Sequence, residues 1–216
     1  MRGDLRAVAA FFDRRAPGFD AIYSGDRAAH LRLWDRLTRR NLFERLEFTL
    51  DTLAPLAGAS VLDVGCGSGR YGLLLAERGA SEVVGIDVAP RMLEIAESLA
   101  RAHGSADRCV YLCVAAEAYR PQREFDGVVA MGFFDYTADA AGLLAHLRPL
   151  TRRRLVASFP ARAAFRAPFR RAWLGLRGCP VYFYDAEQVR RMAEDAGFGR
   201  ARVVRRGPIL LLVAEP

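Results

Sequence analysis

The chain has 216 residues, of which 52% are apolar and 26% are charged. This composition is ordinary for a globular protein, and the length suits one domain with a substantial core. A charged N-terminal stretch argues against a signal peptide, and the longest apolar run near the C-terminus is too short to span a bilayer. We therefore expect a cytoplasmic protein.

The net charge of +7 is concentrated in one part of the chain, and all 32 basic residues are arginine. Residues 151–180 contain eight arginines and no acidic residue, so the rest of the chain carries −1 once this +8 is subtracted from +7. One local patch favours an anionic substrate, or a peripheral membrane or protein contact. A local patch disfavours an extended basic surface that binds along a nucleic acid.

The four cysteines form no CxxC pair and have no histidines at ligand spacing, so neither a zinc site nor a disulfide framework is expected. We predict no bound metal.

Roughly the first sixty residues read as helices, with Pro17 and Gly18 interrupting the first of them. We assign residues 1–58 to an N-terminal helical lid and residues 59–216 to one domain with a basic insertion at about 158–180. In that domain short apolar runs alternate with helical stretches, which predicts a parallel sheet with helices on both faces. The predicted strands are 60–65, 82–87, 109–114, 125–131 and 153–159; the helices between them are 70–78, 90–104 and 138–147.

The C-terminal part begins with a predicted helix over 185–198, where Asp185 is placed to cap the helix and Gly197 to end it. Two further strands, 201–206 and 208–215, are separated by Gly-Pro and predict an antiparallel hairpin at the sheet edge. The fold class is therefore α/β, with a seven-stranded, mostly parallel sheet and an antiparallel C-terminal hairpin.

The stretch VLDVGCGSGRYG (residues 61–72) places a glycine-rich loop at the turn from the first strand to the first helix. Free backbone N–H groups at such a turn bind anions, and glycines let a ligand approach the main chain closely. A dinucleotide fingerprint would read GxGxxG, whereas this loop reads GxGxG. Asp63 would repel a pyrophosphate but attract an ammonium or sulfonium group.

A second acid, Asp87, ends the next strand about twenty residues after the loop, which is the spacing expected for a carboxylate that binds both ribose hydroxyls. A carboxylate for a ribose, a carboxylate near a cationic group and a bare backbone for a carboxylate tail together describe S-adenosylmethionine (SAM).

These motifs, with VVGIDVAPRMLEIA and FDGVVAM, resemble those of the class I SAM-dependent methyltransferases over about residues 60–150. The resemblance implies a Rossmann-like fold, SAM as cofactor and S-adenosylhomocysteine (SAH) as product. The cofactor-binding residues it implies are Asp63, Gly65 and Gly67 at the methionine end, with Cys66 and Gly69 in the same loop; Asp87 at the ribose; Val88 and Met92 flanking the adenine; Ala116 and Glu117 after the third strand; and Met131 and Gly132 at the exit of the methyl group.

The chain departs from this family after the third strand, where many members have an aspartate that binds the adenine amino group. Ala115 stands at that position, and Glu117 lies two residues further on. Backbone groups near Ala116 are then expected to bind the adenine, or the affinity is lower than usual.

No strong general base stands out, and an acceptor carboxylate, already ionised at neutral pH, would need none. Asp135 and Tyr136 occur where class I enzymes often contact the acceptor, and His30 in the lid is a third catalytic candidate. For the substrate we select Phe134 and three arginines spaced four residues apart: Arg162, Arg166 and Arg170. These arginines alternate with aromatic residues and would suit a flat, anionic, hydrophobic acceptor, a membrane surface, or simply a solvated face over a core stripe.

The flanking segments resemble the magnesium-protoporphyrin O-methyltransferases, which esterify a porphyrin propionate. By that resemblance Tyr23 would close over the SAM site. That group usually has a histidine after its fourth strand, and this chain has Phe134-Asp135-Tyr136 there. We expect a small hydrophobic acceptor that is anionic or phenolic, and O-methylation. The alternatives are a nucleic-acid methyltransferase, although MGFFDY is not the loop of a base aminomethylase, and a SAM-binding subunit without catalysis.

Overall fold

The computed structural model describes residues 7–14, 44–162 and 181–216. Residues 7–14 and 44–53 are helical. The elements that follow are β1 (Ser60–Val64), α3 (Arg70–Glu77), β2 (Glu82–Asp87), α4 (Pro90–Ala102), β3 (Cys109–Cys113), the short 3-10 helix η1 (Ala116–Ala118), β4 (Phe125–Ala130), α5 (Ala140–Leu147), η2 (Arg148–Leu150), β5 (Thr151–Pro160), α7 (Ala186–Asp195), β6 (Arg200–Arg206) and β7 (Ile209–Glu215).

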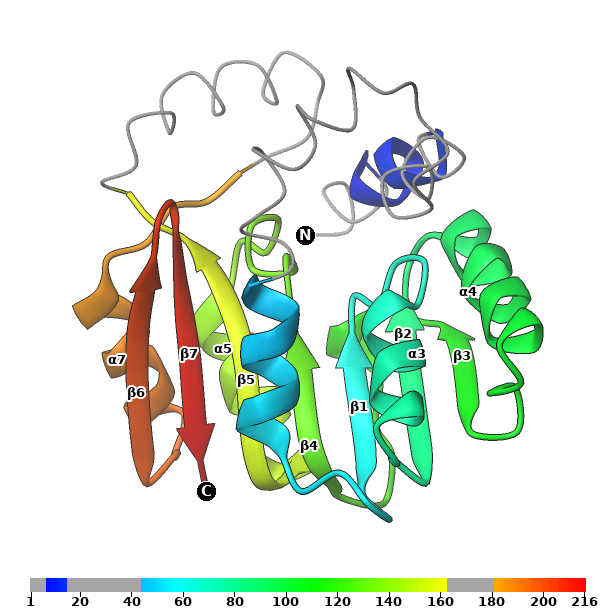
Figure 1. The fold of residues 1–216 in the computed structure, drawn as a ribbon. Helices are drawn as coiled ribbons and strands as arrows, with labels where there is room; N and C mark the ends of the chain where they lie inside the picture. Colours follow the sequence, from blue (N-terminus) through cyan, green and yellow to red (C-terminus); the bar gives the residue numbers. More distant parts are fainter. Residues whose placement is uncertain (1–6, 15–43, 163–180) are drawn as a thin grey trace.

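The strands form one seven-stranded sheet in the order β3-β2-β1-β4-β5-β7-β6. Strands β1 to β5 pair in parallel, whereas β7 pairs antiparallel with both β5 and β6. The predicted fold class, a mostly parallel sheet with an antiparallel C-terminal hairpin, is confirmed. The last strand does not lie at the edge, because β7 is inserted between β5 and β6 (Figure 1).

Helices cover both faces of the sheet (Figure 1). On one face, residues 44–53 and α3 pack their apolar side chains on the central strands, as Leu53 and Leu75 do against Val129 and Val156. On the other face, α5 and α7 pack on β4, β5 and β7 through residues such as Leu144 and Val189. The central strands are therefore buried on both faces, which explains their continuous apolar sequences.

Helix α7 begins after Asp185, as predicted, but the capping interaction differs from the expectation. The Asp185 side chain makes no capping hydrogen bond. Its carboxylate lies 3.3 Å from the Arg162 guanidinium instead. The Asp185 carboxylate therefore forms an ion pair with Arg162 and does not cap the helix.

The helix at residues 7–14 lies over the carboxyl ends of the strands, beside the start of α4 (Figure 1). Asp13 accepts a hydrogen bond from the Arg91 N–H at 3.1 Å. This bond satisfies one of the open N–H groups in the first turn of α4. The Phe11 side chain packs with Val181, and Phe12 packs with Ala89 and Met92. The described part of the predicted lid thus touches the domain on both sides of the strand ends. The division at residue 58 stays a prediction.

Candidate functional site

A cavity of about 580 Å³ opens at the carboxyl ends of the parallel strands, and its volume is in the range of small-molecule sites. Its wall includes the ends of β1, β2, β3 and β4 together with the helix at residues 7–14. Most of the predicted cofactor residues line it: Asp63, Gly65, Cys66, Gly67, Asp87, Val88, Met92, Ala116, Glu117, Met131 and Gly132. Asp135 and Tyr136 line it too. Residues that are scattered in the sequence therefore meet in one hollow.

The glycine loop lines this cavity, and its backbone adopts conformations that favour glycine. Gly65 and Gly67 have φ angles of 67° and 53°. A Cβ atom at Gly65 would overlap the Phe133 ring, so any larger residue would force that ring to move. The Gly65 N–H donates to the Ile86 carbonyl at 2.8 Å, which ties the loop to the end of β2.

Gly69 belongs to the same loop but does not line the cavity; it is the N-cap of α3 with φ 73°. A Cβ atom there would lie 2.6 Å from the Tyr111 hydroxyl and 2.7 Å from the Ala96 methyl group. Gly69 therefore lets the start of α3 close over Tyr111. The contact of Gly69 with a cofactor stays a prediction.

Asp63 is a carboxylate held inside the protein, with only 2% of its surface exposed. Its Oδ2 atom has no hydrogen-bond partner among the described residues. Burial, and then the neighbouring charge of Asp87, raise its pKa from 3.8 to about 7, against a hydrogen bond from the Gly72 main chain. A buried acceptor of this kind that faces a cavity is suited to a cationic ligand.

Asp87 is tied to the main chain at both carboxylate oxygens. Oδ2 accepts from the Gly67 N–H and Oδ1 from the Ala89 N–H, each at 2.9 Å. Burial raises the pKa of Asp87, and hydrogen bonds from the main chain at Gly67, Ala89 and Val88 oppose that rise. The carboxylate is therefore fixed at the cavity wall, and each oxygen keeps a lone pair for a ligand.

The apolar residues Val88, Met92, Val114 and Leu143 also line the cavity. The Val114 N–H donates to the Asp87 carbonyl at 2.9 Å, so the ends of β2 and β3 are joined at this point. Glu117 lines the cavity too, and its Oε2 atom is buried without a hydrogen-bond partner among the described residues.

The wall after β4 carries the residues we selected for the acceptor, with one change. The Gly132 N–H donates to the Ser158 hydroxyl at 2.8 Å, and Phe133 lines the cavity. Phe134 does not line it. Its ring is fully buried and stacks on Phe159 with the ring centres 4.3 Å apart. Phe134 was expected to contact the substrate, but its ring lies in the core, and it is the neighbouring Phe133 that lines the cavity.

Asp135 and Tyr136 follow on this wall, and the segment before α7 holds their loop through hydrogen bonds. The Asp135 carbonyl accepts from the Tyr182 N–H at 2.9 Å, and the Tyr184 hydroxyl donates to the Thr137 carbonyl at 3.2 Å. The Tyr136 ring meets the Phe12 ring edge-on at 5.3 Å. The loop after β4 is therefore fixed, and Phe12 closes it from the side of the lid.

Of the other selected residues, the structure describes Arg162 alone. Tyr23, His30, Arg166 and Arg170 lie outside the described residues. Arg162 is exposed on the surface, donates to the Gln188 side chain at 3.4 Å in addition to its ion pair with Asp185, and does not line the cavity. The structure thus gives Arg162 partners on α7 and its N-cap.

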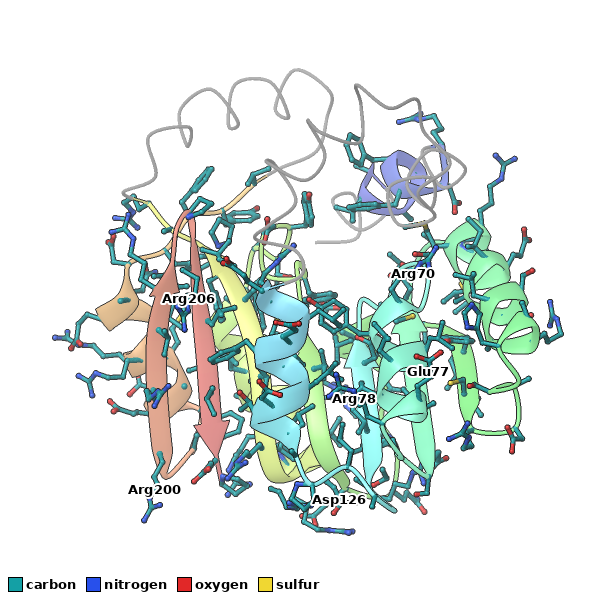
Figure 2. The ribbon with its side chains drawn as sticks, viewed as in Figure 1. Arg70, Glu77, Arg78, Asp126, Arg200 and Arg206 are labelled. Carbon is teal, nitrogen blue, oxygen red and sulfur yellow. The ribbon has the colours of Figure 1, made fainter. Side chains whose placement is uncertain are left out.

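Sequence reasoning missed some of the cavity wall, namely Val8, Phe12, Arg45, Arg70, Tyr71, Arg120 and His146. Arg70 lies where α3 begins, next to the cavity, whereas Glu77 and Arg78 lie at the opposite end of that helix (Figure 2). His146 lies near the end of α5. Its Nε2 lies 2.9 Å from the Tyr119 carbonyl, and burial followed by the charge of Arg120 lowers its pKa. His146 lies one helical turn after Leu143 on α5, and both residues line the cavity. The spacing of the two residues in the predicted helix is therefore the signal that could have placed His146 at the site.

Among the described residues, no group of three histidine, cysteine, aspartate or glutamate side chains is arranged to hold a metal ion. Within the same residues no helix is both long and apolar enough to cross a membrane.

Comparisons with known proteins agree with this geometry. Residues 61–153 match the family described as "Methyltransferase domain". The ubiquinone biosynthesis O-methyltransferase of Leptothrix cholodnii is 37% identical over 102 residues, 46% of this chain and 43% of that protein. A tRNA U34 carboxymethyltransferase of Shewanella piezotolerans is 35% identical over 96 residues, 44% of this chain and 29% of that protein. The chain thus spans less than half the length of these curated relatives.

Solved structures are similar over nearly the whole chain. The magnesium protoporphyrin IX methyltransferase of Synechocystis PCC 6803 with bound SAH has a TM-score of 0.78 at 22% identity, over 98% of this chain and 99% of that one. The cyclase SpnF has a TM-score of 0.70 at 19% identity, over 96% of this chain and 94% of that one.

The strand order, the loop after β1 and the matched family together define a class I SAM-dependent methyltransferase fold. Within that fold, residues 61–153 are the part that matches the methyltransferase family model. The cyclase shares the fold, so the fold does not by itself establish the reaction.

Proposed function

We propose that the protein is a SAM-dependent methyltransferase that methylates an oxygen atom of a small, hydrophobic acceptor carrying a carboxylate or a phenol. The observation that carries this proposal is the pair Asp63 and Asp87 at adjacent strand ends of one cavity, with Oδ2 of Asp63 buried and without a partner among the described residues. The bare loop at Gly65 and Gly67 accepts the carboxylate tail of the cofactor, and Asp63 faces its ammonium group. Asp87 takes the two ribose hydroxyls.

When bound, SAM supplies a methyl group on a positively charged sulfur. The acceptor oxygen contributes an electron pair to the new C–O bond, and the electrons of the broken C–S bond stay on sulfur, which becomes a neutral thioether. The residues of this chain bring the two partners together and exclude water from between them. Met131, Gly132 and Phe133 line the methyl group's path, and Phe12 with Tyr136 covers it from the lid side.

The ionisation of the acceptor decides whether the protein must remove a proton. A carboxylate is already ionised at neutral pH, whereas a phenol loses its proton during the reaction. Asp135 is the cavity residue that would take such a proton, and the bond from the Tyr182 N–H to its carbonyl holds its main chain in place. Tyr136 lies next to it, where a hydroxyl would orient the acceptor.

A porphyrin propionate is the acceptor we place first. The flanking segments resemble the magnesium-protoporphyrin O-methyltransferases, and the likeness to the Synechocystis PCC 6803 enzyme extends over both chains. The curated relative that methylates oxygen in ubiquinone biosynthesis supports a phenolic acceptor as the second choice.

The test is an incubation of the protein with SAM and magnesium protoporphyrin, read by mass spectrometry for the monomethyl ester. Phenolic and small carboxylic acceptors run in parallel, and the Asp63→Asn variant serves as the control with a damaged cofactor site. Ester formed by the wild type and lost in the variant is expected. If the protein binds SAH, forms no ester with any carboxylate and forms a methyl ether with a phenol, the acceptor is a phenol and not a propionate. Failure to bind SAH would refute the proposed function.

Methylation of a nucleic acid is the competing function, and one matched relative is a tRNA U34 carboxymethyltransferase. The basic charge confined to residues 151–180 is the feature that would meet RNA. Binding of tRNA that weakens steeply with salt and depends on those arginines would favour it. Salt-insensitive or absent binding would leave the small acceptor in place.

A further inference from the structure

The sheet face that carries the helix at residues 44–53 is covered unevenly by the described residues. Leu50 and Leu53 of that helix pack in one cluster with Val129 of β4 and Val156 of β5. Figure 1 shows the helix in front of β5, and no described element lies in front of β6. Strand β6 is two strands away from β5 in the sheet, which places it about 10 Å to the side.

Two arginines of β6 lie on this uncovered part of the face. Arg202 is opposite Val213 of β7, which is opposite Val156 of β5, and opposite residues in a sheet point to the same side. Because Val156 packs with the helix, Arg202 points to the helix side too. Arg206 follows four residues later and shares this side. Both arginines are exposed and make no ion pair among the described residues. We call them the basic row.

The helix at residues 44–53 carries acids on its outer side. Glu47 and Asp51 are one turn apart and exposed, whereas Leu50 and Leu53 face the sheet. We call Glu47 and Asp51 the acidic row. Neither acid makes an ion pair among the described residues. The basic row lies to the side of the helix, and exposed charges about 10 Å apart are largely screened at physiological salt. Within one copy, the described residues therefore leave both rows unpaired.

We propose that this face is an interface between two copies of the chain, in which the acidic row of each copy pairs with the basic row of the other. In a two-fold dimer, residue i of one copy meets residue j of its partner, and residue j meets residue i. A face that carries both rows at separate places is thus complementary to itself. Three half-buried residues beside the basic row form the apolar centre of this interface: Val204, Ile209 and Val213.

The charges of this face favour a second copy over a polyanion. An RNA backbone or an anionic membrane that met the basic row would also approach the acidic row on the adjacent helix, and like charges repel. A second copy brings a cation to each acid and an acid to each cation. This inference concerns the surface alone and does not depend on the proposed reaction.

The experiment measures the mass of the full chain by analytical ultracentrifugation over a range of micromolar concentrations. We expect a particle of twice the chain's 23.9 kDa at low salt, which dissociates as salt screens the charge pairs. Arg202→Glu combined with Arg206→Glu brings like charges together, and so does Glu47→Arg combined with Asp51→Arg. Each double variant should raise the dissociation constant of the dimer at least about a hundredfold.

A mixture of the two double variants is the decisive sample. In a mixed pair the unchanged rows meet each other and so do the reversed rows, so the dimer should form again. The matched control is Arg153→Glu combined with Arg191→Glu, the same change in charge at exposed residues on the side of the sheet that α7 covers. It should leave the dimer unchanged, and thermal melting should show all the variants folded.

Three results would overturn the interface: a wild type that stays monomeric at low salt, double variants that dimerise as the wild type does, or a mixture that stays monomeric. The wild type is also tested with tRNA and with anionic vesicles. If a monomeric wild type binds either one and loses this binding in Arg202→Glu with Arg206→Glu, the basic row serves an anionic partner and not a second copy.

Discussion

The Asp63→Asn variant should make the protein more stable in mild alkali while it removes cofactor binding. Asp63 has a pKa near 3.8 when the chain is unfolded and about 7 in the fold, because burial and the charge of Asp87 oppose its ionisation. The folded state therefore holds this proton more tightly than the unfolded state. The contribution of Asp63 to stability is largest below pH 4 and is lost as the pH rises to about 7.

The size of this loss follows from the two pKa values. Each tenfold difference in proton affinity is worth about 1.36 kcal/mol, and the interval from 3.8 to about 7 gives about 4 kcal/mol. Asparagine keeps the shape of the side chain and does not ionise. The free energy of unfolding of the variant minus that of the wild type should thus increase by about 4 kcal/mol between pH 4 and pH 8.

Thermal unfolding at several pH values measures this difference, and other titrating groups cancel because they are the same in both proteins. For a chain of this length, 1 kcal/mol shifts Tm by about 2–4 °C. The variant should therefore gain about 10 °C on the wild type between pH 4 and pH 8. Calorimetry with SAH should show the opposite effect on function: a loss of about a hundredfold or more, because the ligand's ammonium group would be buried without its partner.

Two results would refute this reasoning. A difference in Tm that stays constant from pH 4 to pH 8 would mean that Asp63 titrates alike in the folded and unfolded chain. Full SAH affinity in the variant would mean that the ammonium group binds elsewhere. The affinity of the wild type for SAH should also rise with pH up to about 7. Below that pH, SAH binding should release a proton, which calorimetry in buffers of different ionisation enthalpy detects.

Four further substitutions test the rest of the site. Asp87→Ala should weaken SAH binding about a hundredfold and also lower the urea midpoint, since the N–H groups of Gly67 and Ala89 lose their acceptor; unchanged stability would contradict the bonding scheme. Gly69→Ala should cost about 2–4 kcal/mol in urea unfolding, because its φ is 73° and Tyr111 and Ala96 occupy the space. Phe134→Ala should cost about 3–5 kcal/mol, whereas Phe133→Ala should mainly weaken acceptor binding; the reverse order would refute the exchange of their roles.

The local sequence predicted the strands and the loop of the proposed cofactor end well, because their signals lie within single turns. The strand that carries Asp63, the loop that follows it and the strand that ends at Asp87 have the predicted positions. Buried parallel strands require continuous apolar runs, and the turn between strand and helix requires glycine where φ is positive. Both requirements can be recognised in one sequence without knowledge of distant contacts.

Roles that depend on which way a side chain faces were predicted less well. Phe133 and Phe134 are adjacent and chemically alike, yet Phe133 lines the cavity and Phe134 stacks on Phe159 in the core. Asp185 has the sequence position of a cap, but Arg162, 23 residues earlier, holds its carboxylate. Phe159 and Arg162 lie in other parts of the chain, so the neighbouring residues alone do not indicate either outcome.

The contact between Phe12 and Tyr136 links the two ends of the proposed site. Phe12 packs on Met92, which we expect to flank the adenine. Its ring also meets the Tyr136 ring, with the ring centres 5.3 Å apart, in the loop after β4 where we expect the acceptor. Tyr136 in turn belongs to the loop that Tyr184 holds through the Thr137 carbonyl. A change in the position of residues 7–14 therefore alters the cofactor wall and the acceptor wall together. For this reason the substitution Phe12→Ala should weaken SAH and acceptor binding in parallel, whereas a change confined to Asp135 should affect the acceptor alone.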